Sequence, residues 1–267
     1  MGNISIVTAF FDIGRGDWTP DKGLPHYLQR TTDTYIERFS HLAKLNNELI
    51  VFTSQDLVDK IKDKCPDRSA TTHFVIIDFD NQFQEQRAFI SKIQKDPNFQ
   101  RMINPYQVKN PEYWSADYVL VNYLKTFFVE YAIKEGFATN ETVSWMDFGY
   151  CREESTLNGK TEWAYDFAED KIHFFDYKTY NGQPIQQIIA NNDVHILGAK
   201  IVANKNLWPK LRELISGAFK NLTDANLIDD DQTMMLLATL YQPDLFELHR
   251  IVESDPCLLY TSPSPRD

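Results

Sequence analysis

Runs of apolar and β-branched residues recur along the first half of the chain, and stretches with helical spacing separate them. Such runs predict buried strands at residues 4–10, 48–53, 71–78 and 142–146. The spacing of apolar residues between them predicts helices at residues 27–45, 56–64 and 115–135. This alternation of strands and helices is typical of an α/β fold with a largely parallel sheet and nucleotide-fold character.

The second half of the chain mixes shorter elements of both kinds. Its pattern predicts strands at residues 172–175 and 194–197 and helices at residues 207–219 and 232–240. Apolar residues make up 43% of the chain and aromatic residues 13%, as expected for a globular protein with a substantial core. Because no linker or low-complexity tract interrupts the pattern, we expect a single domain over residues 1–256.

The last eleven residues do not belong to this pattern. Residues 257–267 read Cys-Leu-Leu-Tyr-Thr-Ser-Pro-Ser-Pro-Arg-Asp. The same series results from translating a common transposon-type sequencing adapter in one frame. We therefore interpret this segment as a translated adapter rather than native sequence, and we expect the natural C-terminal part to be missing.

The charge of the chain narrows the classes of partner. A formal net charge of −11 argues against non-specific binding to nucleic acid, which requires a basic surface.

Outside residues 257–267 the cysteines are Cys65 and Cys151, whose spacing predicts neither a zinc site nor a disulfide framework. The N-terminus has no basic stretch followed by a long apolar run, so we expect neither a signal peptide nor a transmembrane segment. These features indicate a cytoplasmic protein.

Asp147 is the first candidate for chemistry. It directly follows the apolar run 142–146, and Gly149 allows a tight turn beside it. Ligands bind at the carboxyl ends of strands in open α/β sheets. A carboxylate held at that edge can bind a divalent cation such as Mg²⁺ or Mn²⁺, and the cation can bind a diphosphate. The alternative interpretation is that Asp147 only begins a turn.

Two other acidic segments compete with Asp147. Asp78-Phe79-Asp80 is an Asp-x-Asp sequence after the predicted third strand, and its two carboxylates could share one metal ion. Residues 229–231 are three consecutive aspartates before an apolar helix, where acids commonly cap free backbone amides and favour the helix dipole. Chain position favours Asp147 over Asp78, because a metal-binding acid usually follows several βα units.

Several segments resemble the bacterial HtrL/YibB family. The resemblance covers nearly the whole chain up to residue 256 and is carried by residues 4–18, 48–54, 115–118, 145–150 and 230–233. It implies a fold near the GT-A glycosyltransferases, with a mixed, mostly parallel sheet flanked by helices. It also implies transfer of a sugar from a nucleotide-sugar donor to a lipopolysaccharide or other surface-glycan acceptor, and a divalent metal held by an Asp-x-Asp motif. Here Asp147-Phe148-Gly149 stands in place of that motif, so one metal carboxylate is either lost or supplied by a residue elsewhere.

The chemistry implied by this resemblance assigns expected roles to individual residues. Asp147 would hold the metal, and Asp230 or Asp231 would accept the proton of the acceptor hydroxyl. The residues expected to bind the donor are Thr8, Ala9, Phe10, Gly14, Arg15 and Lys125. Aromatic candidates for stacking against the acceptor sugar are Tyr150, Trp163 and Trp208. His249 is a further candidate metal ligand, with a buried core histidine as the alternative.

Other functions remain compatible with the sequence. Gly149 in place of a second acid favours a sugar-nucleotide-binding or regulatory protein that has lost transfer activity. Asp78 and Asp80 would instead suit a nucleotidyltransferase. For the transferase, the expected partners are a nucleotide-sugar donor and a glycan or lipid-linked acceptor, without nucleic acid. Its expected location is the cytoplasm, with peripheral contact at the inner face of the inner membrane.

Overall fold

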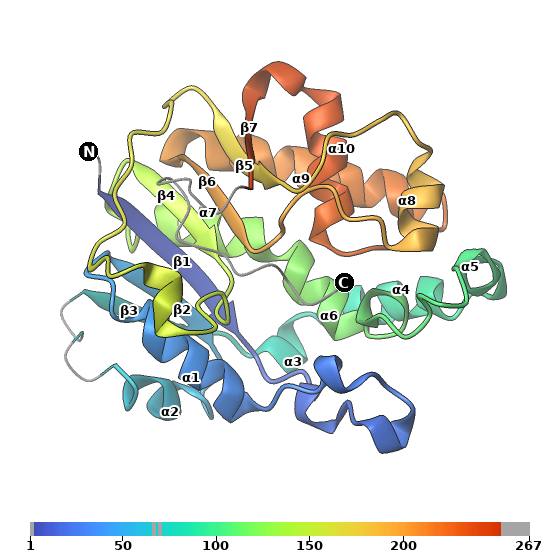
Figure 1. The fold of residues 1–267 in the computed structure, drawn as a ribbon, viewed down its shortest axis with the longest axis horizontal. Helices are drawn as coiled ribbons and strands as arrows, with labels where there is room; N and C mark the ends of the chain where they lie inside the picture. The colour runs from blue at the N-terminus through green and yellow to red at the C-terminus, as the bar shows by residue number, and fades with distance from the viewer. Residues whose placement is uncertain (1–2, 66–67, 69–70, 252–267) are drawn as a thin grey trace.

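The computed structural model describes residues 3–65, 68 and 71–251, and its strands form one seven-stranded sheet in the order β3-β2-β1-β4-β6-β5-β7 (Figure 1). The strands are β1 (Ile4–Phe10), β2 (Leu49–Thr53), β3 (Thr72–Ile76), β4 (Thr142–Met146), β5 (Ile172–Asp176), β6 (Lys200–Asn204) and β7 (Phe246–Arg250). β1 to β4 pair in parallel, β6 is antiparallel to both β4 and β5, and β7 is parallel to β5. The predicted mixed, mostly parallel sheet is confirmed.

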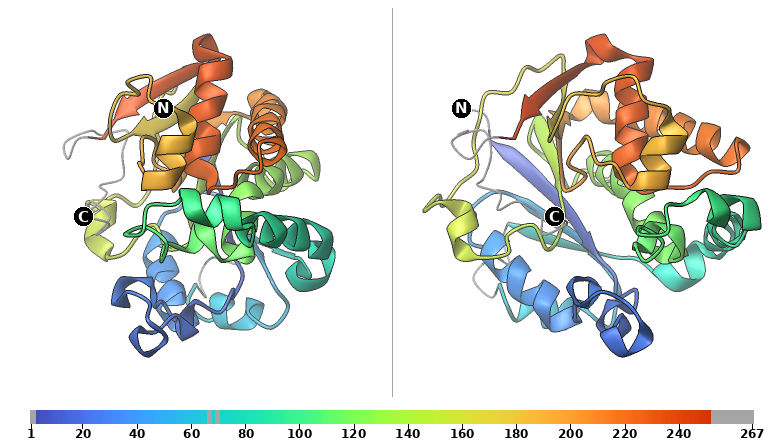
Figure 2. Two further views of the ribbon diagram at one scale, coloured as in Figure 1. Left: turned by 90° about the vertical axis from the view of Figure 1, so that its right-hand side faces the viewer. Right: turned by 45° about the vertical axis from the view of Figure 1, so that its right-hand side comes forward.

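Helices cover both faces of the sheet. The α-helices are α1 (Thr32–Leu42), α2 (Val58–Lys62), α3 (Phe79–Gln82), α4 (Gln84–Gln94), α5 (Pro97–Met102), α6 (Ala116–Tyr123), α7 (Lys125–Lys134), α8 (Ile185–Asn191), α9 (Trp208–Asp224) and α10 (Asp231–Tyr241). α1 and α2 pack on one face, and α7, α9 and α10 contribute to the core on the other (Figure 1). α4 and α5 extend beyond α6, away from the strands, in both Figure 1 and Figure 2.

The first strand is buried from both sides, which explains its continuous apolar run. Ile4, Ile6 and Phe10 contribute to the core beneath α1, whereas Val7 and Ala9 contribute to the core beneath α7. Every residue of β1 is buried. A strand covered on both faces has no solvent side to show as alternating polar positions.

The direction of the chain through the sheet reverses at β1. From β1 the chain passes through α1 to β2 and on to β3 on one side, and it returns through α6 and α7 to β4 on the other side. The carboxyl ends of β1 and β4 are therefore neighbours whose following segments diverge. In open α/β sheets this reversal leaves a crevice, which is where ligands bind.

One predicted strand is wrong. Residues 194–197 form no strand; Ile196 makes only an isolated bridge to Asp176, and the strand is β6 at residues 200–204. β6 was not predicted because it begins with a lysine, which the sequence pattern treats as a surface residue. The side chain of Lys200 is fully buried, with Nζ 3.8 Å from the centre of the Phe175 ring, and a buried cation has no counterpart in hydrophobic periodicity.

The predicted helices differ from the observed ones mainly at their ends. The helix predicted at 27–45 is shorter, since Thr31 caps α1 by accepting a hydrogen bond from the Thr34 amide at 3.2 Å. The helix predicted at 115–135 is divided by a turn at Leu124 into α6 and α7. The sequence pattern missed the helices α3, α4, α5 and α8 and the strand β7. Short 3₁₀ helices occupy Arg15–Asp17, Pro20–Lys22, His26–Leu28, Pro111–Tyr113, Glu154–Leu157, Lys205–Leu207 and Pro243–Leu245.

Within residues 3–65, 68 and 71–251, no helix combines the length and the apolar character needed to cross a bilayer. The segment interpreted as a translated adapter, residues 257–267, lies outside the described residues.

Candidate active site

A cavity of about 610 Å³ opens where the chain direction reverses, at the carboxyl ends of β1 and β4. Ala9 and Phe10 line it from β1, and Asp147 and Tyr150 line it from the segment after β4. The start of α10 closes another side with Asp230 and Asp231. The volume is in the range of small-molecule sites in proteins, and its position is the one expected for a nucleotide site in this class of sheet.

Lys125 joins three segments at the base of this cavity. Its Nζ lies 3.0 Å from Asp147 Oδ1 and 2.7 Å from Asp231 Oδ2, and it donates a hydrogen bond of 2.9 Å to the carbonyl oxygen of Gly198. The lysine side chain is only 5% exposed, whereas that of Asp147 is 39% exposed. A buried ammonium group therefore sits beneath a carboxylate that faces the open cavity.

Local structure explains how these groups meet. The turn at Leu124 makes Lys125 the first residue of α7, which packs against β1 and β4. Asp147 follows the last residue of β4, and its backbone amide donates to the carbonyl oxygen of Ala199 at 2.8 Å. The indole Nε1 of the buried Trp145 donates to Asp147 Oδ1 at 2.8 Å. The acid is thus anchored on both its backbone and its side chain.

The three consecutive aspartates each contact a different partner. Asp229 Oδ2 accepts a hydrogen bond of 2.6 Å from the Thr233 hydroxyl, and Asp230 Oδ1 caps α10 by accepting one of 3.0 Å from the Gln232 amide. Asp231 faces Lys125 instead. Both of the predicted outcomes, capping and a place in the site, therefore occur within one run.

The electrostatic setting of these groups is unusual. Burial, reinforced by Asp230 and Asp147 and opposed by Lys125, raises the pKa of Asp231 to about 7. Burial and the neighbouring Asp230 raise the pKa of Asp229 as well. Burial disfavours charge on Lys125, but the carboxylates of Asp147 and Asp231 outweigh it, so the pKa of this lysine is raised. The site therefore combines a buried lysine whose pKa is raised with a buried acid whose pKa is also raised.

Gly149 stands where the Asp-x-Asp motif has its second acid, and packing explains the exchange. A Cβ at this position would lie 2.9 Å from Cδ1 of Tyr35. A carboxylate would need still more room, so an aspartate at position 149 requires the tyrosine ring to move. The packing of α1 against the segment after β4 therefore favours glycine over an acid at position 149.

Four arginines gather around this segment, and we refer to Arg15, Arg30, Arg38 and Arg152 as the arginine cluster. All except Arg38 line the cavity. Burial, followed by the charges of Arg30 and Arg152, lowers the pKa of Arg38. Among the described residues, no carboxylate lies within ion-pair distance of Arg30 or Arg38. In a chain of net charge −11, such an accumulation of positive charge favours an anionic ligand.

Arg15 is held at the edge of the cavity by neighbouring aromatic residues. It donates hydrogen bonds of 2.5 Å to the Tyr35 hydroxyl and 3.2 Å to the Leu28 carbonyl oxygen, and its guanidinium lies 5.0 Å from the Trp18 ring centre. Its buried Nε has no hydrogen-bond partner among the described residues. The other members of the arginine cluster were missed from the sequence, because they are scattered between α1, the loop before it and the loop after β4.

The remaining predicted residues lie elsewhere. Thr8 is fully buried and Gly14 lies in the following loop, and neither lines the cavity, although their neighbours do. The predicted acceptor role of Trp163 and Trp208 is wrong. Both side chains are fully buried in the core and lie outside the cavity, so they are not placed to stack on a sugar. Of the predicted acceptor aromatics, Tyr150 lines the cavity.

Asp78 and Asp80 lie outside the cavity too. Asp78 caps α3, with Oδ1 accepting a hydrogen bond of 3.3 Å from the Asn81 amide. The side chain of Asp80 is 93% exposed and lies 3.8 Å from Arg87. Asp78 is thus occupied in capping a helix, and neither acid lies at the cavity between β1 and β4.

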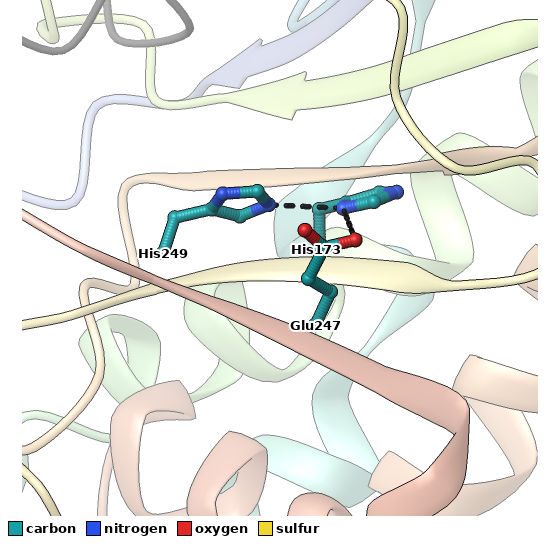
Figure 3. A group of neighbouring side chains, drawn as sticks. All are labelled: His173, Glu247 and His249. Carbon is teal, nitrogen blue, oxygen red and sulfur yellow. Dashed lines mark hydrogen bonds and ion pairs between the residues drawn. The ribbon is translucent and has the colours of Figure 1, made fainter.

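His249 does not approach Asp147. It lies on β7 beside His173 and Glu247, and none of these three residues lines the cavity (Figure 3). The structure thus separates two residues that the sequence interpretation had considered as ligands of one metal ion.

Comparison with known proteins gives similarities of different strength. The crystal structure of mouse xyloside xylosyltransferase 1 in its apo form is similar with a TM-score of 0.43 and 11% sequence identity, over 92% of this chain and 84% of that one. Protein HtrL of Escherichia coli (strain K12) is 40% identical over 252 residues, which cover 92% of this chain and 87% of HtrL. Residues 2–258 match the model of a family described as bacterial protein of unknown function (HtrL_YibB). The chain therefore belongs to the HtrL/YibB family.

Proposed function

We propose that this protein is a glycosyltransferase of GT-A-like fold that binds a nucleotide-sugar in the cavity between β1 and β4. The observation that carries the proposal is the position of Lys125, Asp147 and Asp231 at the carboxyl edge of the sheet, next to the arginine cluster. Such an edge suits a nucleotide, and the concentrated positive charge suits its diphosphate. The resemblance of the sequence to a family placed near the GT-A enzymes supports the same assignment.

The proposed reaction breaks the bond between the sugar and the diphosphate and forms one to an acceptor hydroxyl. Negative charge develops on the departing diphosphate as the sugar becomes oxocarbenium-like. Lys125 and the three arginines that line the cavity would supply positive charge at that place, and contacts within the protein already hold Lys125 and Arg15. Positioned charge of this kind lowers a barrier because little reorganisation is needed during the reaction.

In an inverting transfer, the acceptor proton would pass to a carboxylate on the side opposite the leaving group. Asp231 fits this role better than Asp230, whose side chain caps α10. Both acids line the cavity, and the pKa of Asp231, raised by burial to about 7, is near the optimum for a general base. The acceptor sugar would stack against Tyr150, which is the predicted aromatic that lines the cavity.

The residues present fit a divalent metal bound chiefly by the substrate. Asp147 is half-exposed, and its contacts with Lys125 and Trp145 both fall on Oδ1, so Oδ2 would take the Mg²⁺ or Mn²⁺. One carboxylate is enough when phosphate oxygens and water supply the other ligands. When bound, the metal would add positive charge to the departing diphosphate.

We further propose a surface-glycan acceptor and a reaction in the cytoplasm at the inner face of the inner membrane. The family resemblance supports the acceptor class. The free thiols of Cys65 and Cys151, both buried, are compatible with a reducing compartment.

Calorimetric titration with UDP, GDP and CMP, each with and without Mn²⁺, tests the proposal. We expect one nucleoside diphosphate to bind, with affinity reduced by omission of Mn²⁺ and by Asp147→Ala. Asp80→Ala is the matched control, because Asp80 is an exposed acid outside the cavity and should leave binding unchanged. Binding of none of the three nucleotides would refute the nucleotide-sugar assignment.

A sugar-nucleotide-binding protein without transfer activity is the second candidate. The packing of Tyr35 against Gly149, which excludes a second metal acid, favours it. Release of the sugar from the preferred nucleotide-sugar, measured with and without a mixture of glycan acceptors, separates the two. Turnover that Asp231→Asn abolishes supports the transferase, whereas tight binding without any turnover supports the binding protein.

A further inference from the structure

A second cluster of potential ligands lies on the other half of the sheet, at the strand pair β5–β7. The register of this parallel pair places His173 opposite Glu247 and Phe175 opposite His249. Residues two apart on a strand share a face, so both histidines and the glutamate project from the same side of the sheet. Figure 3 shows the three side chains pointing toward one another.

The distances within this cluster are short. His173 Nδ1 lies 3.0 Å from His249 Nε2 and 3.5 Å from Glu247 Oε2 (Figure 3). One ligand atom from each residue lies within 4.8 Å of the other two. An ion placed between them would contact two imidazole nitrogens and one carboxylate oxygen without a change in the backbone.

The hydrogen-bonding of His173 fixes the form of its ring. Its Nε2 lies 2.9 Å from the carbonyl oxygen of Ala168, which can only accept, so Nε2 carries the hydrogen. Nδ1 therefore presents its lone pair toward His249 and Glu247. This carbonyl-to-imidazole contact is the usual way in which proteins orient a metal-binding histidine.

The surroundings hold the two histidine rings in place. His173 is 1% exposed, and its ring centre lies 4.7 Å from that of Phe167. Phe175 stacks on His249 with ring centres 5.2 Å apart.

We propose that His173, Glu247 and His249 form a zinc site that ties the edge strand β7 to β5. Two nitrogens and one carboxylate suit Zn²⁺, whereas Mg²⁺ and Ca²⁺ prefer oxygen ligands throughout. Two Zn–N bonds of about 2.1 Å span the observed 3.0 Å at an angle of about 90°, so modest side-chain adjustment gives the wider tetrahedral angle. A water molecule would complete the coordination.

The consequence of this site is structural. β7 lies at the end of the sheet and pairs with β5 among the described strands. A metal bound from both strands would hold this last strand in register. Because none of the three ligands lines the cavity, the zinc site is independent of the proposed glycosyl transfer.

Titration of the chelator-treated full chain with Zn²⁺, followed by calorimetry and by thermal unfolding, tests the proposal. We expect one Zn²⁺ per chain and a rise in Tm on binding. Glu247→Gln and His249→Gln should each weaken Zn²⁺ binding at least about tenfold. Glu247 is half-exposed, so the Glu247→Gln variant should fold normally and decides the matter if His249→Gln does not.

His26→Gln is the matched control, since His26 is an exposed histidine in the short helix His26–Leu28. It should leave the zinc affinity unchanged, as should Asp147→Asn, which distinguishes this site from the cavity. The proposal is overturned if the folded chain does not saturate with Zn²⁺, or if the Glu247 and His249 variants bind it as the unmodified chain does.

Discussion

The carboxylate of Asp231 lies directly against Gly198, so closely that a Cβ at position 198 would lie 2.5 Å from Oδ2. The same oxygen contacts Lys125, whose ammonium group also donates to the carbonyl oxygen of Gly198. The absence of a side chain at this one position therefore allows the acid, the lysine and the backbone before β6 to meet. The geometry of the candidate site depends on a residue that takes no part in its chemistry.

Gly198→Ala should displace the Asp231 carboxylate from Lys125. Overpacking of this kind lowers the free energy of unfolding by about 1–3 kcal/mol. We also expect the rate of sugar release from the nucleotide-sugar to fall. Gly217→Ala is the matched control, because a Cβ there meets nothing within 4 Å and the residue lies within α9. That change should stabilise the protein by about 0.5–1 kcal/mol through helix propensity. Chemical denaturation of both variants measures the contrast, and equal stabilities would contradict the packing argument.

Lys125→Met should lower the free energy of unfolding by about 1–3 kcal/mol, because it leaves buried acceptor oxygens of Asp231 and Gly198 without their hydrogen-bond donor. Lys220→Met, which removes an exposed ion pair with Asp224, should change it by less than about 1 kcal/mol. Combining Lys125→Met with Asp231→Asn should restore part of the loss, since the buried carboxyl group that lost its partner is then removed. Denaturant titrations of the unmodified chain, Lys125→Met, Asp231→Asn and the double variant give the coupling energy. Strict additivity would show that the two groups act separately.

The raised pKa of Asp231 predicts a pH dependence of stability. Its folded-state pKa of about 7 exceeds the ordinary 3.8, so between these values the folded protein holds a proton that the unfolded chain has released. The free energy of unfolding therefore falls as pH rises through this window, by at most about 1.4 kcal/mol per pH unit for this group. Asp229 contributes in the same direction. Denaturation at pH 5, 6, 7 and 8 should show a shallower decline for Asp231→Asn, and parallel curves would exclude the assigned shift.

The arginine cluster should recognise the diphosphate more than the nucleoside. Arg30→Gln is expected to weaken binding of the preferred nucleoside diphosphate about tenfold, equivalent to about 1.4 kcal/mol, and to change monophosphate binding less. Arg101→Gln, an exposed arginine on α5, should have no effect. Calorimetry at two salt concentrations measures the diphosphate and monophosphate affinities of both variants, and shows how far each depends on charge. If Arg30→Gln binds the nucleoside diphosphate as tightly as the unmodified chain does, Arg30 does not bind the diphosphate.

The sequence predicted the architecture better than it predicted the complete site. The continuous apolar runs of β1 and β2 and the position of Asp147 after β4 are local patterns, and the structure places them as expected. The buried Lys200 hid β6, because periodicity treats lysine as a surface residue. The segment from residue 79 to 114 carries short helices that pack on α6 rather than on the strands, and it was not anticipated.

The candidate site shows the same limit. Asp147 and Asp231 each stand at a predicted element boundary, whereas Lys125 was placed within a continuous predicted helix, and each of the three was found singly. Their mutual contact depends on the turn at Leu124 and on the space left by Gly198, and neither is encoded in residue spacing. The pairing of His173 with Glu247 and His249 depends on the register of two strands separated by more than seventy residues.

The hydrogen bond from Trp145 to Asp147 has a practical consequence. The indole is 1% exposed and stacks on Phe128, and its Nε1 contacts an acid that faces the cavity. Indole fluorescence responds to nearby charge, so any ligand that alters the electrostatic environment of Asp147 will alter the emission of a chromophore sealed in the protein interior. Because the chain contains five tryptophans, the signal from Trp145 is the part of the emission change that is absent from a Trp145→Phe variant, and it reports occupancy of the cavity without any label.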